Sequence, residues 1–458
     1  MNVGSFPADP AFPQLEIATD PTLMKQTFRT HLRPVGAKVY DIEDCRLMRL
    51  RYRQGSRCFL LYTLRLVEPD TDRERDVQVT GLIYAEKGKA EQAWRKLKAT
   101  EPLQEIPDAW LTFEPVSFVP KLEMLVQVFP YDHRLPALPH LAGGPPPELE
   151  PVLLGRFGPG DWRVEAWNIE PVRYREQGAV LRYRAKARNA ATGERIERRF
   201  YAKVYRDEGQ GQQTHQVLRE LWKQARANGE GFTVARPLAY LSGLRTLLQE
   251  EAPGTSLEEI LLEDGDTTGT VRRVAQALAA FNQGDAPTTA RQYFLADQVA
   301  DLERYGRVLG QACPHLRVEV ESIIEGVLAG LEEVPLRPTH QDLKPDHILV
   351  DGGRMIFIDL DAFARADPVL DPAHLLARLA IRALFPGPRE ETHTAAQEFA
   401  EEYFAHVPGE WHDRLPFQYA GILLKKAHSF VRRQVPDWPD KIATVLEEAK
   451  ASLAGRVW

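Results

Sequence analysis

Cysteine is scarce in this chain of 458 residues, which contains only Cys45, Cys58 and Cys313. No two of them are spaced as Cys-x-x-Cys, so the sequence gives no sign of a cysteine-ligated metal cluster. Such sparing use of cysteine indicates a reducing compartment. We therefore expect a cytoplasmic protein.

Long apolar runs and an excess of positive charge are also missing. No run is long enough to span a bilayer, and residues 1–7 have neither the basic start nor the apolar core of a signal peptide. The net charge of −7 gives no general case for binding nucleic acid or an anionic membrane, although a local basic patch stays open. The expected partner is a small molecule, not a nucleic acid or a membrane.

The most informative segment spans residues 339–361. It places Asp342 on a turn ahead of an apolar strand at 348–350, and it places Asp359 at the end of a second strand at 355–358. Acids on neighbouring β-elements can converge on one point. The sequence therefore predicts a site that contains two carboxylates.

Phosphoryl transfer needs such a site, because the protein mainly positions a hydroxyl while metal ions and cations neutralise the phosphate charge. Asp342 would accept the proton of the attacking hydroxyl, and Asp359 would hold Mg²⁺. Lys344 would lean over the transferred group as a mobile cation, and His347, five residues after Asp342, is the expected second metal ligand. The alternative is an ordinary β-hairpin with turn and capping residues, which does not explain the joint spacing.

This spacing resembles the kinase catalytic loop His-x-Asp-x-x-x-x-Asn with a metal-binding Asp behind it. No Ala-Pro-Glu follows Asp359, and the chain runs instead into Ala-Asp-Pro-Val-Leu-Asp-Pro-Ala-His-Leu-Leu-Ala, which resembles the aminoglycoside phosphotransferase and choline kinase family. The resemblance implies a small-molecule kinase that uses ATP or GTP with Mg²⁺. It also implies an α+β, protein-kinase-like fold with two lobes, an antiparallel β N-lobe and a mainly helical C-lobe.

One position departs from the family pattern, because His347 stands where the family has Asn. Mg²⁺ prefers oxygen ligands and an imidazole is softer, so we expect a weaker or differently tuned second metal site. The resemblance further implies that Asp371 accepts backbone hydrogen bonds from the catalytic loop. A simple helix N-cap is the alternative for Asp371.

A kinase of this kind also needs a lysine that grips the nucleotide phosphates and a helix glutamate that orients it. Lys203 lies on an alternating strand, and Glu220 lies in a segment with apolar residues at helical spacing. The turn at 176–178, with one glycine, is the candidate phosphate-covering loop. The candidate hinge for the nucleotide base consists of Gln249, Glu250 and Glu251. Taken singly, these positions equally suit a solvated strand, a surface helix and plain turns.

The first 128 residues resemble an extra copy of the lobe that follows them. Residues 50–62 parallel 172–183, and the lead-in at 6–15 parallels 129–138, with a separation of about 120 residues throughout. The alternative is that two antiparallel sheets share their alternation and their Arg-Tyr pairs through composition alone.

Aligned by eye, Glu86 of the first copy stands opposite Lys203, and Lys96 stands opposite Glu220. A carboxylate in the place of the lysine would repel the nucleotide phosphates. We therefore expect that this copy cannot bind ATP and that its role is structural or regulatory.

Hydrophobic residues make up 43% of the chain, enough for several packed cores, and its length allows roughly three domains. We predict a degenerate N-lobe-like copy at 1–128, a lead-in and catalytic N-lobe at 129–250, and a helical C-lobe with the substrate site at 251–458. The run Gly-Gly-Pro-Pro-Pro at 143–147 is the best candidate linker, because it cannot continue a helix or strand.

The C-terminal half is predicted to be mostly helical, with a capping box at Ser256 and Glu259, an amphipathic helix around 271–281 and another helix at 318–331. The family places substrate recognition on helices near 285–310 and 380–440. Acids and aromatics there could bind a cationic group or a sugar, but a solvated helix face over a packed aromatic core is the simpler interpretation. These residues are Glu390, Glu391, Glu398, Phe399, Glu401, Glu402, Tyr403, Phe404, Trp411 and Trp438.

Together these features predict a kinase that transfers the nucleotide γ-phosphate to the hydroxyl of a sugar, an aminoglycoside or an amino alcohol. A sugar is the preferred class, on the breadth of the family alone. The rival is a catalytically weak pseudokinase that binds nucleotide as a scaffolding module, with His347 and the added lobe as its clues. A protein kinase is disfavoured because the activation segment is missing.

Overall fold

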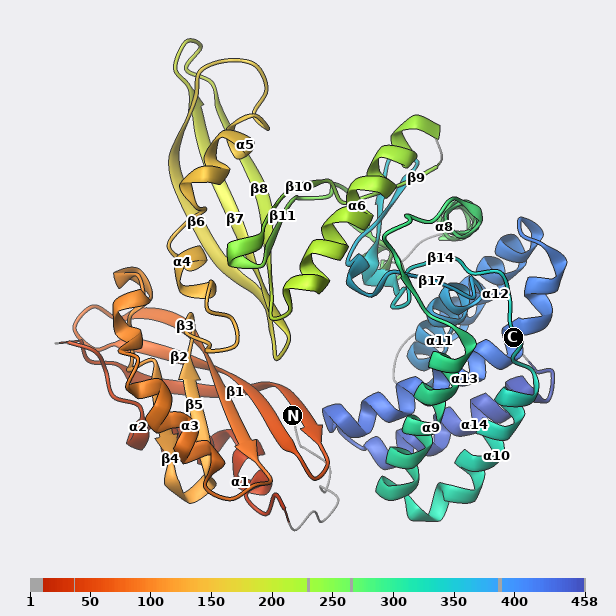
Figure 1. Cartoon of the computed structure of the whole chain (residues 1–458), viewed down its shortest axis with the longest axis horizontal. Helices are drawn as coiled ribbons and strands as arrows, with labels where there is room; N and C mark the ends of the chain where they lie inside the picture. Colours follow the sequence, from red (N-terminus) through yellow and green to blue (C-terminus); the bar gives the residue numbers. More distant parts are fainter. Residues whose placement is uncertain (1–10, 37, 229–230, 264–266, 386–388, 457–458) are drawn as a thin grey trace. The chain divides into compact units, whose positions relative to one another are not determined.

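The computed structural model describes residues 11–456 apart from 37, 229–230, 264–266 and 386–388. The chain forms two compact units, whose elements are labelled in Figure 1. Unit 1 comprises Met1–Glu208, Leu238–Gln249 and Arg432–Asp437. Unit 2 comprises Gly209–Pro237, Glu250–Val431 and Trp438–Trp458.

The first sheet of unit 1 is antiparallel and has five strands in the order β1-β2-β3-β5-β4. Alternate residues of β2 point to opposite faces, so Leu60 and Tyr62 pack with the helices α1 and α2 while Phe59 and Leu61 belong to a second core. The elements are α1 (Leu15–Thr19), α2 (Pro21–His31), β1 (Asp41–Arg53), β2 (Arg57–Glu68), β3 (Arg73–Tyr84), α3 (Lys89–Lys98), β4 (Val116–Val119) and β5 (Met124–Val128).

The second sheet of unit 1 has the order β6-β7-β8-β11-β10. Its buried residues Leu181, Tyr183 and Phe200 share one hydrophobic core with Phe59 and Leu61 of the first sheet. The elements are α4 (Leu138–Ala142), α5 (Glu150–Leu154), β6 (Trp162–Arg175), β7 (Gly178–Asn189), β8 (Arg195–Tyr205), β10 (Pro237–Leu241) and β11 (Thr246–Glu250).

The two sheets of unit 1 share several features. Both have the same strand order, and each first strand, β1 or β6, carries two bulges against its neighbour. The hydroxyl of Tyr62 donates to the carbonyl of Ala18 at 2.6 Å, and the hydroxyl of Tyr183 donates to the carbonyl of Leu141 at 3.0 Å. In each sheet, therefore, a tyrosine of the second strand is hydrogen-bonded to the short helix that precedes the sheet.

The register of the strands corrects the alignment of Glu86 with Lys203. Lys203 pairs with Val180, which lies three positions before Tyr183. In the first sheet, Phe59 lies three positions before Tyr62, and it pairs with Leu82. Glu86 lies beyond the end of β3 and forms an ion pair with Lys89 at 2.6 Å. The predicted charge swap is therefore wrong, because a repeated Tyr-Ala was matched without the strand pairing that fixes register. The first sheet has a buried leucine at this position.

Unit 2 is mainly helical and contains two small sheets, with the orders β12-β15-β16-β9 and β13-β17-β14. The predicted capping box forms at Ser256 and Glu259, and the predicted amphipathic face is buried on α8. The helices are α6 (Glu208–Asn228), α7 (Leu257–Ile260), α8 (Thr268–Gln283), α9 (Leu295–Ala312), α10 (Arg317–Ala329), α11 (Leu370–Leu384), α12 (Arg389–Ala405), α13 (Gly409–Arg433) and α14 (Trp438–Leu453). The strands are β9 (Phe232–Val234), β12 (Thr255–Ser256), β13 (Arg291–Gln292), β14 (Arg337–Thr339), β15 (Ile348–Asp351), β16 (Arg354–Phe357) and β17 (Ala364–Ala366).

The predicted α+β class, with antiparallel sheets first and a mainly helical part after them, is confirmed. The run at 143–147 does not separate the two units, because it lies inside unit 1 between leucines of one core. The three predicted domain ranges stay a prediction, and residues 6–10 of the lead-in lie outside the described part of the chain. Among the described residues, no helix combines the length and the apolar character needed to cross a membrane.

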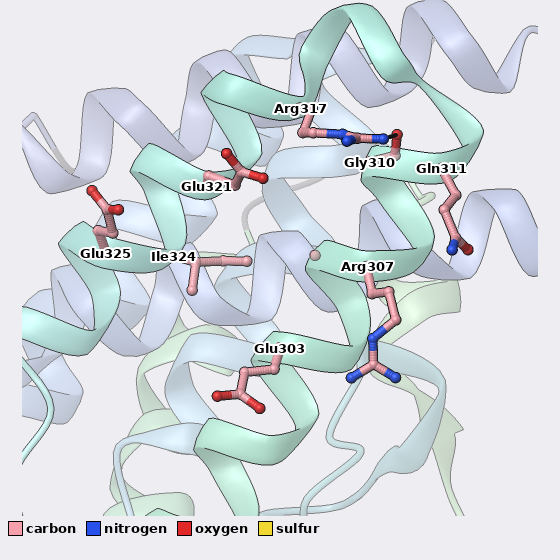
Figure 2. A pocket seen from close by; sticks show the side chains of 9 residues that line it. Glu303, Arg307, Gly310, Gln311, Arg317, Glu321, Ile324 and Glu325 are labelled. Atoms are coloured by element: carbon pink, nitrogen blue, oxygen red, sulfur yellow. Dashed lines mark hydrogen bonds between the residues drawn. The ribbon is translucent and has the colours of Figure 1, made fainter.

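A hollow of about 550 Å³ lies between α9 and α10 (Figure 2). The two helices approach closely because Gly306 faces Ile324, where a Cβ would lie 2.4 Å from the isoleucine Cδ1. The hollow is lined mostly by charged side chains of these two helices. It includes no residue of the 339–361 segment.

Candidate active site

The segment that follows β14 is held by Asp371 of α11. The buried carboxylate of Asp371 accepts hydrogen bonds from the backbone N–H groups of His340 (2.8 Å) and Gln341 (3.0 Å) and from the side-chain amide of Asn282 (2.9 Å). Gln341 adopts a left-handed conformation, with φ of 68°, so the chain turns sharply just before Asp342. The predicted role of Asp371 in tying the loop is confirmed, and it is not the helix N-cap.

His340 joins this loop to the strand that leads to Asp359. Its Nε2 lies 2.9 Å from the carbonyl oxygen of Ile358, so Nε2 carries a proton and donates it. The imidazole is completely buried, and burial lowers its pKa below the ordinary value. His340 is therefore a neutral structural link between the two β-elements.

His347 contacts both the loop of Asp342 and the side chain of Asp359. Its Nδ1 lies 3.1 Å from the carbonyl oxygen of Asp342, and its Nε2 lies 3.2 Å from Oδ2 of Asp359. Asp359 itself adopts a left-handed conformation with φ of 60°, which turns the chain after β16. His347 therefore connects the loop that carries Asp342 to the side chain of Asp359, and the convergence of the two carboxylates stays a prediction.

The carboxylate of Asp342 lies in a positively charged environment. Burial alone would raise its pKa, but the charges of Lys426, His347 and Lys425 outweigh burial and lower the pKa below the ordinary value. Asp342 is therefore ionised at neutral pH. A carboxylate in this state can accept a hydrogen bond from an incoming hydroxyl.

Lys425 and its neighbours form a pocket beside this loop. The Nζ of Lys425 lies 3.4 Å from the carbonyl oxygen of Gln341 and 3.3 Å from Nε2 of His374. With Tyr293 and Asp301 these residues line a cavity of about 20 Å³, which is room for about one water molecule. Asp301 accepts hydrogen bonds from the hydroxyls of Tyr293 (3.1 Å) and Tyr305 (3.3 Å).

No sequence pattern pointed to this pocket. Lys425 and His374 come from α13 and α11, far along the chain from Gln341, and their spacing matches no motif. Asn282 was missed for the same reason. Contacts between distant helices leave no local signal in a single sequence.

The chain matches the model of a known protein family. A family model described as the phosphotransferase enzyme family matches residues 159–432, more than half of the chain. The chain belongs to this phosphotransferase family. The resemblance drawn from the 339–361 segment is therefore confirmed, although the match does not test the extra N-terminal copy.

Several solved structures are similar to part of this phosphotransferase. A choline/ethanolamine kinase family protein from Mesorhizobium loti is 16% identical, with 66% of this chain and 90% of that chain covered and a TM-score of 0.42. Choline kinase LicA from Streptococcus pneumoniae is 15% identical, with 63% and 93% covered and a TM-score of 0.41. The GDP and kanamycin complex of APH(2")-IIia is 14% identical, with 66% and 99% covered and a TM-score of 0.42. These likenesses add nothing to the family match, and no curated protein matches the chain.

The sequence predicts that Asp359 and His347 hold Mg²⁺, and a carboxylate is a ligand that this ion prefers. Nε2 of His347 lies 3.2 Å from Oδ2 of Asp359, so the two predicted metal ligands are neighbours. Across the described residues, no group of three or more His, Cys, Asp or Glu could hold a metal ion.

The imidazole leads to a prediction about metal preference. Replacing His347 with Asn should shift activity toward Mg²⁺ and away from softer ions, so the ratio of Mn²⁺-supported to Mg²⁺-supported kcat should fall several-fold, roughly threefold to tenfold. Steady-state rates with each ion measure this ratio. An unchanged ratio in a folded His347→Asn enzyme would show that His347 does not contact the metal.

Lys344 was predicted to be a mobile cation. In the structure its Nζ lies 2.8 Å from Oδ2 of Asp346, and its side chain is 12% exposed. It is therefore paired with a neighbouring acid in this state. Its role toward a transferred phosphate stays a prediction.

The nucleotide-binding residues predicted from the sequence lie on the expected elements. Lys203 is on β8 of unit 1 and Glu220 is on α6 of unit 2. The chain passes from unit 1 to unit 2 between Gln249 and Glu250, next to Glu251. The pairing of Lys203 with Glu220 and the contacts of the hinge with a base stay predictions.

The acids and aromatics of α12 have ordinary structural partners. Glu398 forms an ion pair with Arg272 of α8 at 2.7 Å, and Glu402 accepts a hydrogen bond from Gln276 at 2.7 Å. Phe399, Tyr403, Trp411 and Trp438 are buried in the core, as the simpler interpretation predicted. The side chains of Glu390 and Glu391 lie outside the described part of the chain.

Proposed function

We propose that this phosphotransferase transfers the γ-phosphate of ATP or GTP to a hydroxyl group of a small molecule. The observation that carries the proposal is the bridge formed by His347 between the loop of Asp342 and the carboxylate of Asp359. In-line phosphoryl transfer requires a base and a metal ligand close together, and a link between the loop of Asp342 and the carboxylate of Asp359 supports that arrangement.

In this proposal Asp342 orients the acceptor hydroxyl and takes its proton. Its lowered pKa keeps it ionised at neutral pH, so its main contribution is positioning, with the proton transferred late in the reaction. Asp359 and His347 would hold Mg²⁺, which supplies charge neutralisation of the nucleotide phosphates. Lys203, oriented by Glu220, would grip the phosphates, and Lys344 would move from Asp346 to the transferred group.

The surroundings of Asp342 favour a neutral polyhydroxyl acceptor such as a sugar. Lys425 donates toward the residue just before Asp342, and the positive charge of Lys426 also acts on the carboxylate. The ammonium groups of Lys425 and Lys426 would repel a positively charged acceptor, which disfavours an aminoglycoside or a choline-like molecule.

A panel of acceptors tests this preference. With Mg²⁺ and either ATP or GTP, we expect neutral sugars to stimulate nucleotide turnover, while aminoglycosides and amino alcohols stimulate it weakly or not at all. A cationic acceptor with the highest kcat/KM would contradict the assigned class but not the kinase. If nucleotide binds and no acceptor stimulates turnover, the pseudokinase becomes the better description.

We also propose that the first sheet of unit 1 is a second copy of the N-lobe that lacks nucleotide binding. The shared strand order, the paired bulges and the repeated tyrosine hydrogen bond support a duplication. The leucine in place of Lys203 supports the loss of phosphate binding.

The free and buried thiols of Cys45, Cys58 and Cys313 support a reducing compartment such as the cytoplasm.

A further inference from the structure

The turn between β6 and β7 carries a buried carboxylate. The side chain of Glu176 in this turn is only 1% exposed. Its Oε2 lies 3.3 Å from Nη2 of Arg53, and its Oε1 forms a closer ion pair with Nη2 of Arg57. Arg53 and Arg57 face each other across the β1–β2 hairpin. The hairpin tip of the first sheet therefore holds the hairpin tip of the second.

This β6–β7 turn lies in close contact with β8. A Cβ at Gly178 would lie 2.5 Å from the carbonyl oxygen of Val204, so only glycine fits there. Two residues after Gly178, Val180 pairs directly with Lys203. The turn, the strand and the lysine consequently form one antiparallel hairpin unit, and a shift of the turn changes where the lysine is presented.

A carboxylate in this turn needs its two arginines. A buried acid without a partner is strongly unfavourable, and a free carboxylate beside nucleotide phosphates would repel them. Arg53 and Arg57 remove both unfavourable effects, because they pair with the charge of Glu176 and keep its carboxylate directed away from solvent. Both arginines belong to the first sheet, which has a leucine where the second sheet has Lys203.

We propose that the β1–β2 hairpin of the extra sheet fixes the nucleotide-covering turn of the catalytic sheet through the Arg53–Glu176–Arg57 cluster. Glu176 is then a positioning residue for nucleotide binding, and the extra N-terminal copy acts as a clamp on that turn. This inference rests on the proposed function, because it takes the β6–β7 turn to be the loop that covers the nucleotide phosphates.

The test is the affinity for ADP and for GDP with Mg²⁺, measured by titration calorimetry on the full chain, so that no acceptor is needed. Arg57→Ala should weaken the better-bound nucleotide about tenfold, and Arg57→Lys should restore most of the affinity. The control is Arg46→Ala, which removes an exposed ion pair with Asp76 (2.8 Å) on the same sheet and should leave affinity unchanged. Melting temperatures show whether each variant is folded.

Glu176→Gln keeps the test decisive if Arg57→Ala does not fold. A positioning role predicts weaker nucleotide binding, because the charge-assisted contacts that hold the turn are lost. A purely electrostatic effect predicts tighter binding, because a negative charge near the phosphates has been removed. Unchanged or tighter binding in folded Glu176→Gln would overturn the clamp while the kinase assignment stands. A wild-type chain that binds neither nucleotide would overturn both.

Discussion

Replacing Asp342 with Asn is expected to lower kcat about 10³-fold while nucleotide binding is kept. Asn has nearly the shape of Asp but cannot accept the proton of the acceptor hydroxyl and orients it poorly. The backbone carbonyl of Asp342 that contacts His347 remains in the variant, so the loop and the metal ligands should stay in place. Turnover with the best acceptor and calorimetric nucleotide affinity measure the two effects separately.

The matched control is Asp351→Asn, at an exposed acid at the end of β15, in the hairpin that follows Asp342. Its kcat should stay within about twofold of the wild-type value, because surface substitutions away from special features have small effects. If Asp342→Asn keeps more than a tenth of the activity while Asp351→Asn behaves normally, Asp342 is not the catalytic acid–base residue.

The second large effect is expected at Asp371, which touches no reacting atom. In Asp371→Asn one carboxylate oxygen becomes an amide that cannot accept, so a backbone N–H of His340 or Gln341 loses its buried partner. Such a loss costs about 1–3 kcal/mol of unfolding free energy. A displacement of the loop by about 1 Å should also lower the kcat of the enzyme about 10²-fold.

Chemical denaturation and kcat together test the role of Asp371. The control is again Asp351→Asn, at an exposed acid outside the helices, and it should alter neither quantity. A fall in stability with normal kcat would show that the loop does not depend on Asp371 for its catalytic geometry. Normal values of both would contradict the contribution of its hydrogen bonds altogether.

The catalytic loop could be predicted because its chemistry is local. Asp342, His347 and Asp359 lie within a short stretch of chain, and the two strands between them fix their geometry. Asp371 could be placed only through the family resemblance. The structure then supplied the reason, in the two backbone N–H groups that it accepts.

Features that depend on strand register or on contacts between distant helices could not be predicted. Glu86 was matched to Lys203 by letters alone, whereas hydrogen-bonded pairing puts Leu82 at that position. Lys425 reaches the catalytic loop from α13, and the Glu176 cluster joins residues of two different sheets. A single sequence does not encode such pairs in any local pattern.

We propose that this protein moves a phosphoryl group from a nucleotide to a small-molecule hydroxyl at Asp342. The most direct test follows labelled γ-phosphate from ATP and GTP into a panel of sugars, aminoglycosides and amino alcohols, with wild-type protein and Asp342→Asn. We expect one labelled phosphate in a neutral sugar for each nucleotide consumed, and almost none with the variant. Label that reaches no acceptor, or that reaches one equally well without Asp342, would contradict it.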